Sequence, residues 1–347
     1  MTSFLIIFLI SVMVAFSLTP AAKRLSEYWG VKAQPGGRRR HKSAVPKLGG
    51  LPITIAYAAG IAAIYLIMPP SGDDALRLRG VVLGTLLMFI GGLLDDFKDL
   101  PPWVQFVIQI AGAAIAIGHI VFIEVFTNPI SGDPVWIESF PLVLVITILW
   151  IVGVINTVNW LDGLDGLAVG VGTIAALLFA WHSYRLGQEA VAAFPLALAG
   201  ALIGFLPYNF VPARIFLGSA GAYVLGYNLA SLAILSPAKI ATALLVLAIP
   251  IVDGVWRVID RIRVGRNPFY GDRGHLHFRL ADEGVPIRII VVSYYLFTLA
   301  FGLVAIFATG LAKLVFLSIL GFFVLVFLIW FSIRRGGSED QGSESPE

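Results

Sequence analysis

Long apolar runs alternate with short polar segments along the whole of this 347-residue chain. A helix that crosses the hydrocarbon core of a membrane needs about 20 consecutive, mostly apolar residues. The pattern predicts eleven transmembrane helices, at residues 3–19, 49–68, 80–94, 102–123, 140–158, 164–182, 190–206, 219–235, 239–256, 288–308 and 312–333. We therefore expect residues 1–335 to form one all-α, polytopic integral membrane helical bundle that contains the whole functional domain.

The two ends of the chain have different patterns. Residues 336–347 are acidic, small and polar, a composition that favours a disordered cytoplasmic tail. The first apolar run is followed by Lys23 and Arg24 and preceded by no basic residue. This is the reverse of a secretory signal, so we expect the first run to be a retained helix.

Composition supports a membrane protein, because 58% of the residues are hydrophobic and only 13% are charged. An ordinary soluble chain has about 25% charged residues. The chain has no cysteine, which excludes a disulfide scaffold and a thiolate metal site. Its formal net charge of +3 is too small to indicate a protein that binds nucleic acid.

The 24 Lys and Arg residues are distributed unequally between the loops. If the N-terminus lies outside, 19 of them fall on the cytoplasmic side and 5 on the other. Cytoplasmic loops of membrane proteins carry the excess of Lys and Arg. The sequence thus predicts a multi-pass protein of the cell (inner or plasma) membrane, with its N-terminus outside and its C-terminus cytoplasmic.

The densest polar motifs all fall on the predicted cytoplasmic side. They are Asp95–Asp99, the run N-x-x-N-x-x-D-G-x-D-G at 156–166, and the basic segment Arg261–Arg279 with His275 and His277. Carboxylate oxygens suit Mg²⁺, which also binds substrate phosphates, and Arg and Lys complement phosphate charge. The pattern indicates a site for a phosphorylated substrate and a divalent cation on the cytoplasmic face.

Each motif also has a simpler interpretation. An isolated Asp pair is commonly a solvated turn, and Asn and Asp favour turns and helix starts. The basic segment alone could be a membrane anchor. Within the apolar runs, Gln109, His119 and Asn228 are expected to form interhelical hydrogen bonds. Asp253 is expected to pair with Arg257 one helical turn later.

At these motifs the chain resembles the polyprenyl-phosphate N-acetylhexosamine-1-phosphate transferases, glycosyltransferase family 4. The resemblance covers about residues 20–300. It rests on HKSAVPKLGGLPI (41–53), GGLLDDFKDL (91–100), NTVNWLDGLDGLAVG (156–170), RIFLGSAGAYVLG (214–226) and GDRGHLHFRL (271–280). The last motif is more similar to the N-acetylglucosamine-1-phosphate branch than to the phospho-N-acetylmuramoyl-pentapeptide branch.

The resemblance implies an enzyme that transfers a sugar-1-phosphate, most simply N-acetylglucosamine-1-phosphate, from a UDP-sugar to undecaprenyl phosphate with release of UMP. This would be the first membrane step in the synthesis of a cell-envelope polysaccharide such as lipopolysaccharide or teichoic acid. The implied cofactor is Mg²⁺, with Mn²⁺ as a substitute. The implied partners are the two substrates and membrane lipid, and a homodimer is compatible with the sequence.

The resemblance also implies roles for individual residues. The catalytic positions would be Asp95, Asp96, Asp162 and Asp165. The metal would be held by Asn159, Asp95 and Asp96, so that the aspartate pair serves either as base or as metal ligands. The substrate-binding positions would be Asn156, Lys42, Lys47, His275, His277 and Arg279.

Two positions depart from the family pattern. Ser219 stands where the family usually has an Asp that binds Mg²⁺, and a hydroxyl is a weaker, neutral ligand. Phe278 stands where relatives often carry another His. After the first departure three outcomes are open: the metal depends more on Asn159 and the Asp pair, metal binding is weaker, or another carboxylate takes the place of the missing Asp.

Two alternatives stay open at this point. One is the same chemistry on another UDP-amino sugar, including that of a phospho-N-acetylmuramoyl-pentapeptide transferase. The other is a membrane transporter, or a degenerate transferase that only binds lipid-linked sugar. A transporter would be expected to carry ionisable groups near mid-span and two symmetric halves, whereas the motif carboxylates here gather on one face.

Overall fold

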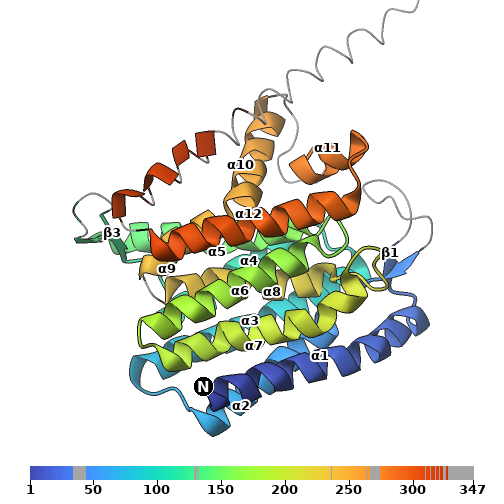
Figure 1. Ribbon diagram of the computed structural model, residues 1–347, viewed down its shortest axis with the longest axis horizontal. Coiled ribbons are helices and arrows are strands. Elements are labelled where there is room, and N and C mark those ends of the chain that lie inside the picture. The colour runs from blue at the N-terminus through green and yellow to red at the C-terminus, as the bar shows by residue number, and fades with distance from the viewer. Residues whose placement is uncertain are drawn as a thin grey trace, which may run out of the picture.

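The computed structural model describes residues 1–33, 44–128, 131, 133–235, 237–263, 265 and 274–308, with short helical pieces between 310 and 326. Twelve helices are assigned in these residues, and most lie side by side in one bundle (Figure 1). They are α1 (Thr2–Tyr28), α2 (Gly50–Ile67), α3 (Gly72–Lys98), α4 (Pro102–Gly118), α5 (Phe140–Leu161), α6 (Leu167–Arg185), α7 (Glu189–Asn209), α8 (Gly218–Ile234), α9 (Pro237–Val246), α10 (Ala248–Arg263), α11 (Leu276–Asp282) and α12 (Ile287–Phe307).

Among the described residues, seven helices are long and apolar enough to cross a membrane, or eight if α9 and α10 form one bent span. Helices α4 and α8 are shorter, at 17 residues each. The predicted polytopic helical membrane fold is therefore confirmed, while eleven spans and the orientation of the termini stay predictions. The predicted span 312–333 lies largely outside the described residues, and the tail 336–347 entirely so.

The prediction of one continuous helix at 239–256 is wrong. The chain breaks there into α9 and α10, which meet at an angle of 78°. Pro250 lies in the first turn of α10, and the residue four positions before it, Val246, is the last of α9. Because proline lacks an N–H and its ring clashes with the carbonyl four residues earlier, the α9 helix cannot continue through this point.

Helix α8 lies at the centre of the bundle, where it packs against α3, α5 and α2. Every residue from Ala220 to Ile234 is buried. Asn228 is fully buried there, and it donates a hydrogen bond to Thr85 Oγ1 on α3 at 2.9 Å and accepts one from the Tyr57 hydroxyl on α2 at 2.9 Å. These bonds satisfy a polar group that would otherwise be costly in an apolar interior, and they confirm the predicted interhelical role of Asn228.

His119 does not follow that prediction. Its Nδ1 lies 2.8 Å from the carbonyl oxygen of Ile115, in the same helix. His119 directly follows Gly118, the last residue of α4, so the imidazole bonds to the final turn of its own helix. The helix predicted at 102–123 thus stops at Gly118, five residues early.

The structure also contains two short antiparallel hairpins, which the all-α prediction did not include. Strand β1 (Lys32–Ala33) pairs with β2 (Val45–Pro46), and β3 (Val125–Thr127) pairs with β4 (Pro134–Trp136). The hairpins lie at opposite ends of the bundle (Figure 1). Strand pairing between such short segments has no periodic signal in the sequence, because two or three residues are too few for an alternating pattern.

Candidate active site

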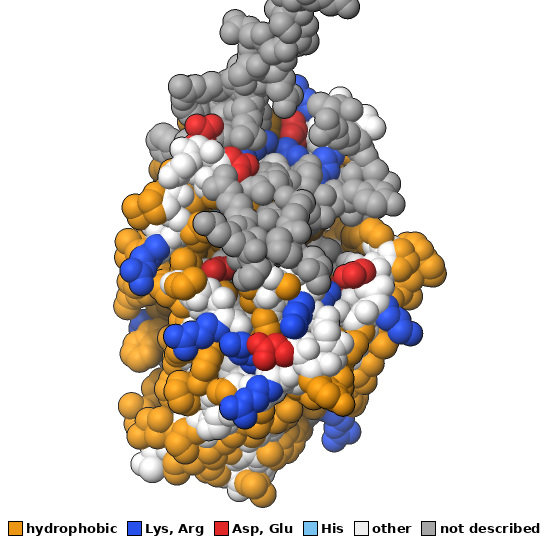
Figure 2. All heavy atoms as spheres, turned by 90° about the vertical axis from the view of Figure 1, so that its right-hand side faces the viewer, with side chains coloured by type: hydrophobic (Ala, Val, Ile, Leu, Met, Phe, Trp, Pro, Cys, Tyr) orange, Lys and Arg blue, Asp and Glu red, His pale blue; other side chains and the backbone are white. Residues whose placement is uncertain are grey.

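Charged side chains gather on the end of the bundle that carries β1. Figure 2 views this end directly and shows Lys, Arg, Asp and Glu side chains at its centre, with apolar side chains around the flanks. The apolar flanks suit contact with lipid, whereas the charged centre requires water or a polar ligand. The predicted site residues Lys47, Asp95 and Asp96 lie at this end, since Lys47 directly follows β2 and contacts Asp99.

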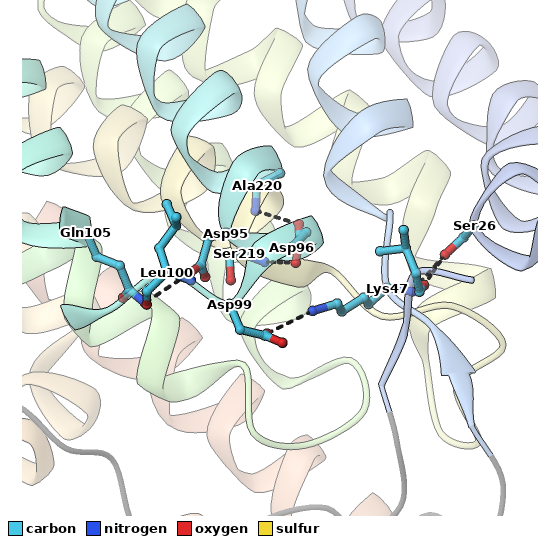
Figure 3. A network of polar contacts seen from close by, with 10 residues as sticks. Ser26, Lys47, Asp95, Asp96, Asp99, Leu100, Gln105, Ser219 and Ala220 are labelled. Atoms are coloured by element: carbon cyan, nitrogen blue, oxygen red, sulfur yellow. Dashed lines mark hydrogen bonds and ion pairs between the residues drawn. The ribbon is translucent and has the colours of Figure 1, made fainter. Parts of the chain in front are cut away.

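Asp96 joins the end of α3 to the beginning of α8. Its Oδ1 accepts a hydrogen bond from the backbone N–H of Ser219 at 2.9 Å, and its Oδ2 accepts one from Ala220 at 3.0 Å (Figure 3). The first N–H groups of a helix have no partner within the helix, and a carboxylate there also interacts favourably with the helix dipole. Asp96, only 3% exposed, therefore caps α8 from a neighbouring helix.

A glycine makes this close approach possible. A Cβ atom at Gly92, one turn before Asp96, would lie 2.5 Å from Ala220 Cα and 2.7 Å from the Ser219 carbonyl oxygen. Only a residue without a side chain allows α3 and α8 to meet here. The GG of the GGLLDD motif therefore supports the position of Asp96.

Asp95 faces the other neighbour, α4. Its Oδ1 accepts hydrogen bonds from the Leu100 N–H at 2.8 Å and from Gln105 Nε2 at 3.1 Å (Figure 3). Asp99 ends α3 in the left-handed conformation, at φ 46°, which turns the chain toward α4. The two neighbouring carboxylates are thus held by different helices. Gln105 was not among the predicted site residues, because nothing in the spacing of the sequence connects it with Asp95.

Lys47 adds a cation beside the aspartates. Its Nζ lies 3.3 Å from Asp99 Oδ1 (Figure 3). The backbone around it is tied to the segment before α8, because Phe216 donates an N–H to Pro46 and Gly49 donates one to Phe216, at 2.8 and 2.9 Å. Of the two predicted lysines, Lys47 thus reaches the site, and Lys42 lies outside the described residues.

The two asparagines of the N-x-x-N motif lie in the last turns of α5 rather than in a loop. Asn156 Nδ2 donates to Gln109 Oε1 at 2.6 Å and to the Val152 carbonyl at 2.8 Å. Both amide protons are used inside the bundle, so Asn156 can offer a ligand only its carbonyl oxygen. This contact confirms the prediction that Gln109 forms a hydrogen bond between helices. Asn159, one turn later, is half-buried.

The D-G-x-D-G loop is fixed from two sides. Asp165 Oδ2 accepts a hydrogen bond from the Ala213 N–H at 2.9 Å. The Tyr295 hydroxyl on α12 donates to the Gly166 carbonyl at 2.5 Å, and Gly166 has the positive φ of 77° that favours glycine. Asp162 is the residue at which α5 ends. Asp165 therefore holds the segment that leads to α8, and the catalytic roles of Asp162 and Asp165 stay predictions.

Helix α11 carries the predicted histidines. His275 Nδ1 lies 2.8 Å from Asp253 Oδ2, and the Leu276 N–H donates to Asp253 Oδ1 at 2.9 Å. Both oxygens of Asp253 are thus engaged by the beginning of α11, and Arg257 forms its ion pair with Asp260. The predicted pairing of Asp253 with Arg257 is wrong, since the fold brings a closer partner to the carboxylate.

His277 lies against the D-G-x-D-G loop. A Cβ at Gly163 would be 2.6 Å from His277 Nε2, and the rings of His277 and Phe278 have centroids 4.3 Å apart. Burial lowers the pKa of the His277 imidazole to about 3, so the ring is neutral at pH 7. Arg279 is also buried on α11. Helix α11 is therefore packed onto the loop that ends the N-x-x-N motif.

The donor set at this end fits a magnesium ion that is shared with substrate. Among the described residues no group of three or more His, Cys, Asp or Glu side chains forms a closed metal site. Mg²⁺ is usually bound by one or two carboxylates together with substrate phosphates and water. Asp95 and Asp96 meet that need. Both hydrogen bonds to Asp95 end on Oδ1, which leaves its Oδ2 for a metal, and each Asp96 oxygen accepts one hydrogen bond and keeps a second lone pair.

The sequence of this chain is similar to those of known proteins. The model of glycosyl transferase family 4 matches residues 78–237, which include Asp95, Asp96, the N-x-x-N motif and the beginning of α8. The chain is 30% identical to the probable undecaprenyl-phosphate N-acetylglucosaminyl 1-phosphate transferase of Bacillus subtilis, over 88% of this chain and 85% of that protein.

Two further relatives come from other bacteria. The undecaprenyl-phosphate alpha-N-acetylglucosaminyl 1-phosphate transferase of Haemophilus influenzae is 30% identical over 92% of this chain and 91% of its own length. The phospho-N-acetylmuramoyl-pentapeptide-transferase of Staphylococcus carnosus is 28% identical over 80% of this chain and 89% of its own length. Such identity over nearly the whole chain shows that the protein belongs to glycosyl transferase family 4, as the motifs predicted.

Proposed function

We propose that this protein transfers N-acetylglucosamine-1-phosphate from its UDP derivative to undecaprenyl phosphate and releases UMP. The observation that carries the proposal is the convergence of the family motifs on one end of the bundle. Asp96 holds α8, Asp95 is held by α4, and Asp165 holds the segment between α7 and α8. The names of the relatives supply the substrate class.

The proposed reaction is one phosphoryl transfer. An oxygen of the lipid phosphate attacks the β-phosphorus of the UDP-sugar, the bond from that phosphorus to the bridging oxygen breaks, and the oxygen leaves with UMP. Such a transfer depends on positioning and charge neutralisation more than on covalent chemistry by the protein. The charged end of the bundle is a suitable place for this transfer. Figure 2 shows apolar side chains around the flanks of this end, and a lipid phosphate would emerge from the bilayer where these flanks end.

The individual site residues have different proposed roles in this transfer. Asp95 and Asp96 are the proposed magnesium ligands together with Asn159, and bound magnesium would neutralise negative charge on the diphosphate. Lys47 offers a cation close to the aspartates. His275, which directly precedes α11, and Arg279 on α11 are proposed to hold the phosphates.

We further propose that this end of the bundle faces the cytoplasm. The support is the excess of Lys and Arg in the loops that lie there in the predicted topology. A cytoplasmic site also agrees with the proposed donor, since a charged nucleotide sugar does not cross the bilayer unaided.

A transfer assay tests the proposal. Purified protein is incubated with undecaprenyl phosphate, Mg²⁺ and a radiolabelled UDP-sugar, and the label that enters a butanol extract is counted. We expect transfer from UDP-N-acetylglucosamine and its loss when EDTA removes the metal. Absence of extractable label with every UDP-sugar offered would refute a transferase.

The same assay separates the sugar specificities. UDP-N-acetylgalactosamine and UDP-N-acetylmuramoyl-pentapeptide are offered in parallel, the second because a pentapeptide-transferase is among the relatives. We expect N-acetylglucosamine to be preferred. Preferred use of the pentapeptide donor would keep the chemistry and correct the substrate.

A further inference from the structure

A cavity of about 70 Å³ lies beside β3 and α9, at the end of the bundle opposite the candidate active site (Figure 1). Its walls come from the second turn of α3, the segment between α4 and β3, the end of α8 and the beginning of α9. A space of this size holds a few water molecules or a small polar group. None of the predicted site residues lines it.

Two side chains of opposite charge line the cavity, Arg77 on α3 and Glu124 just before β3. Within the described part of the chain, Arg77 Nε is buried without a hydrogen-bond acceptor, and neither side chain forms an ion pair. A buried guanidinium N–H without an acceptor is costly. The cavity is therefore complementary to a ligand that brings an anionic group to Arg77 and a cationic group to Glu124.

Ile120 lines the cavity in a backbone conformation that glycine usually adopts, at φ 59°. Its N–H donates to the Ile117 carbonyl, and the N–H of Val121 donates to the Ala116 carbonyl. These two bonds form a Schellman motif at the end of α4, in which the left-handed residue is usually glycine. A β-branched residue in this conformation is strained, and such residues cluster at ligand sites. The isoleucine gives the cavity an apolar wall that glycine would not provide.

The cavity lies at the depth where lipid headgroups are expected. Arg77 comes three residues before the apolar run predicted at 80–94. Trp136 on β4, at the same end of the bundle, is exposed, as is typical of aromatic residues at the level of the headgroups. Ile234 and Ile240 add further apolar side chains to the wall. A lipid whose chains remain in the bilayer can therefore place its headgroup here.

We propose that this cavity binds the headgroup of an ethanolamine phospholipid, with the phosphate at Arg77, the ammonium group at Glu124 and the beginning of the acyl chains against Ile120. A guanidinium suits phosphate because it can donate two parallel hydrogen bonds. Phosphatidylglycerol satisfies Arg77 but leaves Glu124 without a cation, and inorganic phosphate also lacks the chains. The proposal does not depend on the proposed transferase activity.

The first test measures lipid binding by native mass spectrometry of the full chain in detergent, titrated with dioleoylphosphatidylethanolamine. We expect one tightly bound lipid per chain, and Arg77→Gln should weaken its binding by at least about tenfold because the charge-assisted hydrogen bonds are lost. Arg79→Gln is the matched control, since Arg79 is exposed on the same helix and does not line the cavity. Wild-type affinity in Arg77→Gln would overturn the proposal.

The second test compares headgroups. We expect the wild type to bind phosphatidylethanolamine at least about threefold more tightly than dioleoylphosphatidylglycerol, and Glu124→Gln to remove this preference. Glu138→Gln, an exposed carboxylate outside the cavity, should keep it. Equal or tighter binding of phosphatidylglycerol by the wild type would overturn the proposal. Inorganic phosphate that raises the Tm as much as the lipid would identify a free anion site, and absence of bound lipid would leave water as the occupant; either result would overturn it as well.

Ile120→Gly tests the cavity without removing a charge, and it remains decisive if Arg77→Gln fails to fold. Glycine adopts the left-handed conformation without strain, so the Tm of the lipid-free protein should stay the same or rise. Loss of the apolar wall should weaken binding of phosphatidylethanolamine by at least about threefold. Unchanged affinity in Ile120→Gly would show that Ile120 serves only the fold, which would overturn the proposed site.

Discussion

Asp96 binds the backbone of Ser219 across 123 residues of sequence, with 2.9 Å between Oδ1 and the amide nitrogen. The carboxylate at the end of α3 thereby caps the first turn of α8. Ser219 is the position at which the resemblance to the family implies a metal-binding Asp. A carboxylate there would lie close to that of Asp96, so the serine removes like-charge repulsion as well as a metal ligand.

Ser219→Asp is therefore expected to increase the affinity for metal. An additional carboxylate raises the ligand charge at the proposed magnesium site, and a negative charge in the first turn of α8 also suits the helix dipole. We predict that half-maximal activity is reached at roughly tenfold lower Mg²⁺ concentration. Transfer activity measured against Mg²⁺ concentration checks this, with Ser219→Ala as the control that adds no charge. An unchanged Mg²⁺ dependence in Ser219→Asp would contradict a metal at this end of α8.

Asp96→Asn is expected to destabilise the protein. The asparagine NH₂ replaces one of the two acceptor oxygens and leaves an N–H of Ser219 or Ala220 without a partner in a buried place. An unsatisfied buried group costs about 1–3 kcal/mol. We predict a lower Tm in detergent by differential scanning fluorimetry. Asp99→Asn is the control, since the Asp99 side chain is 92% exposed and its ion pair with Lys47 is worth little. Equal Tm values for the two variants would show that the cap adds nothing to stability.

Asp95→Asn separates charge from structure. The asparagine oxygen can still accept from Leu100 and Gln105, so the fold and the Tm should be preserved. Loss of a charged ligand at the proposed metal site should lower kcat by at least about 100-fold, the size of a principal electrostatic contribution to a transition state. Initial rates at saturating substrate measure this, and Asp74→Asn, at the first turn of α3, is the matched control. Activity comparable to wild type would remove Asp95 from the site.

Asp165→Asn tests in the same manner whether the charge of Asp165, in the D-G-x-D-G loop, contributes to transfer activity. Its oxygen can keep the hydrogen bond from Ala213, so an effect on activity would come from charge rather than from loss of the contact. We predict loss of transfer activity with an unchanged Tm. If instead both Asp95→Asn and Asp165→Asn retain full activity, the assignment of the site is wrong.

The buried His277 predicts a pH dependence of stability. Its pKa is about 3 in the folded protein, below the ordinary histidine value of 6.5 that applies to the unfolded chain, so the unfolded chain binds more protons between these values. Stability from this group is therefore complete above pH 6.5 and is lost as the pH falls toward 3, by about 2 kcal/mol at pH 5. Tm measured at pH 7 and pH 5 should fall more in wild type than in His277→Gln. His119→Gln, at the end of α4, should keep the wild-type difference; an equal fall in all three would exclude His277 as the cause.

Local patterns identified much of this protein because they depend on composition and spacing within short segments. Apolar runs of sufficient length predicted the helices, and Asp95, Asp96 and the N-x-x-N-x-x-D-G-x-D-G run marked the site. The buried Asn228 was also correctly expected to bond across helices, since an isolated amide in an apolar run needs a partner. The prediction failed at 239–256, where the effect of Pro250 on the preceding turn outweighed the hydropathy of the run.

The sequence by itself determined that this is a helical membrane protein of a transferase family, and it predicted that most of its Lys and Arg residues lie on one face. Only the tertiary structure decided which charges meet. Asp253 pairs with His275, 22 residues away, rather than with Arg257 one turn along its helix. Asp96 holds α8 rather than lying free beside Asp95. The physical reason is that a buried carboxylate has to accept hydrogen bonds from donors close to it. Helix packing decides which donors are close, and the spacing of residues along the chain does not encode that packing.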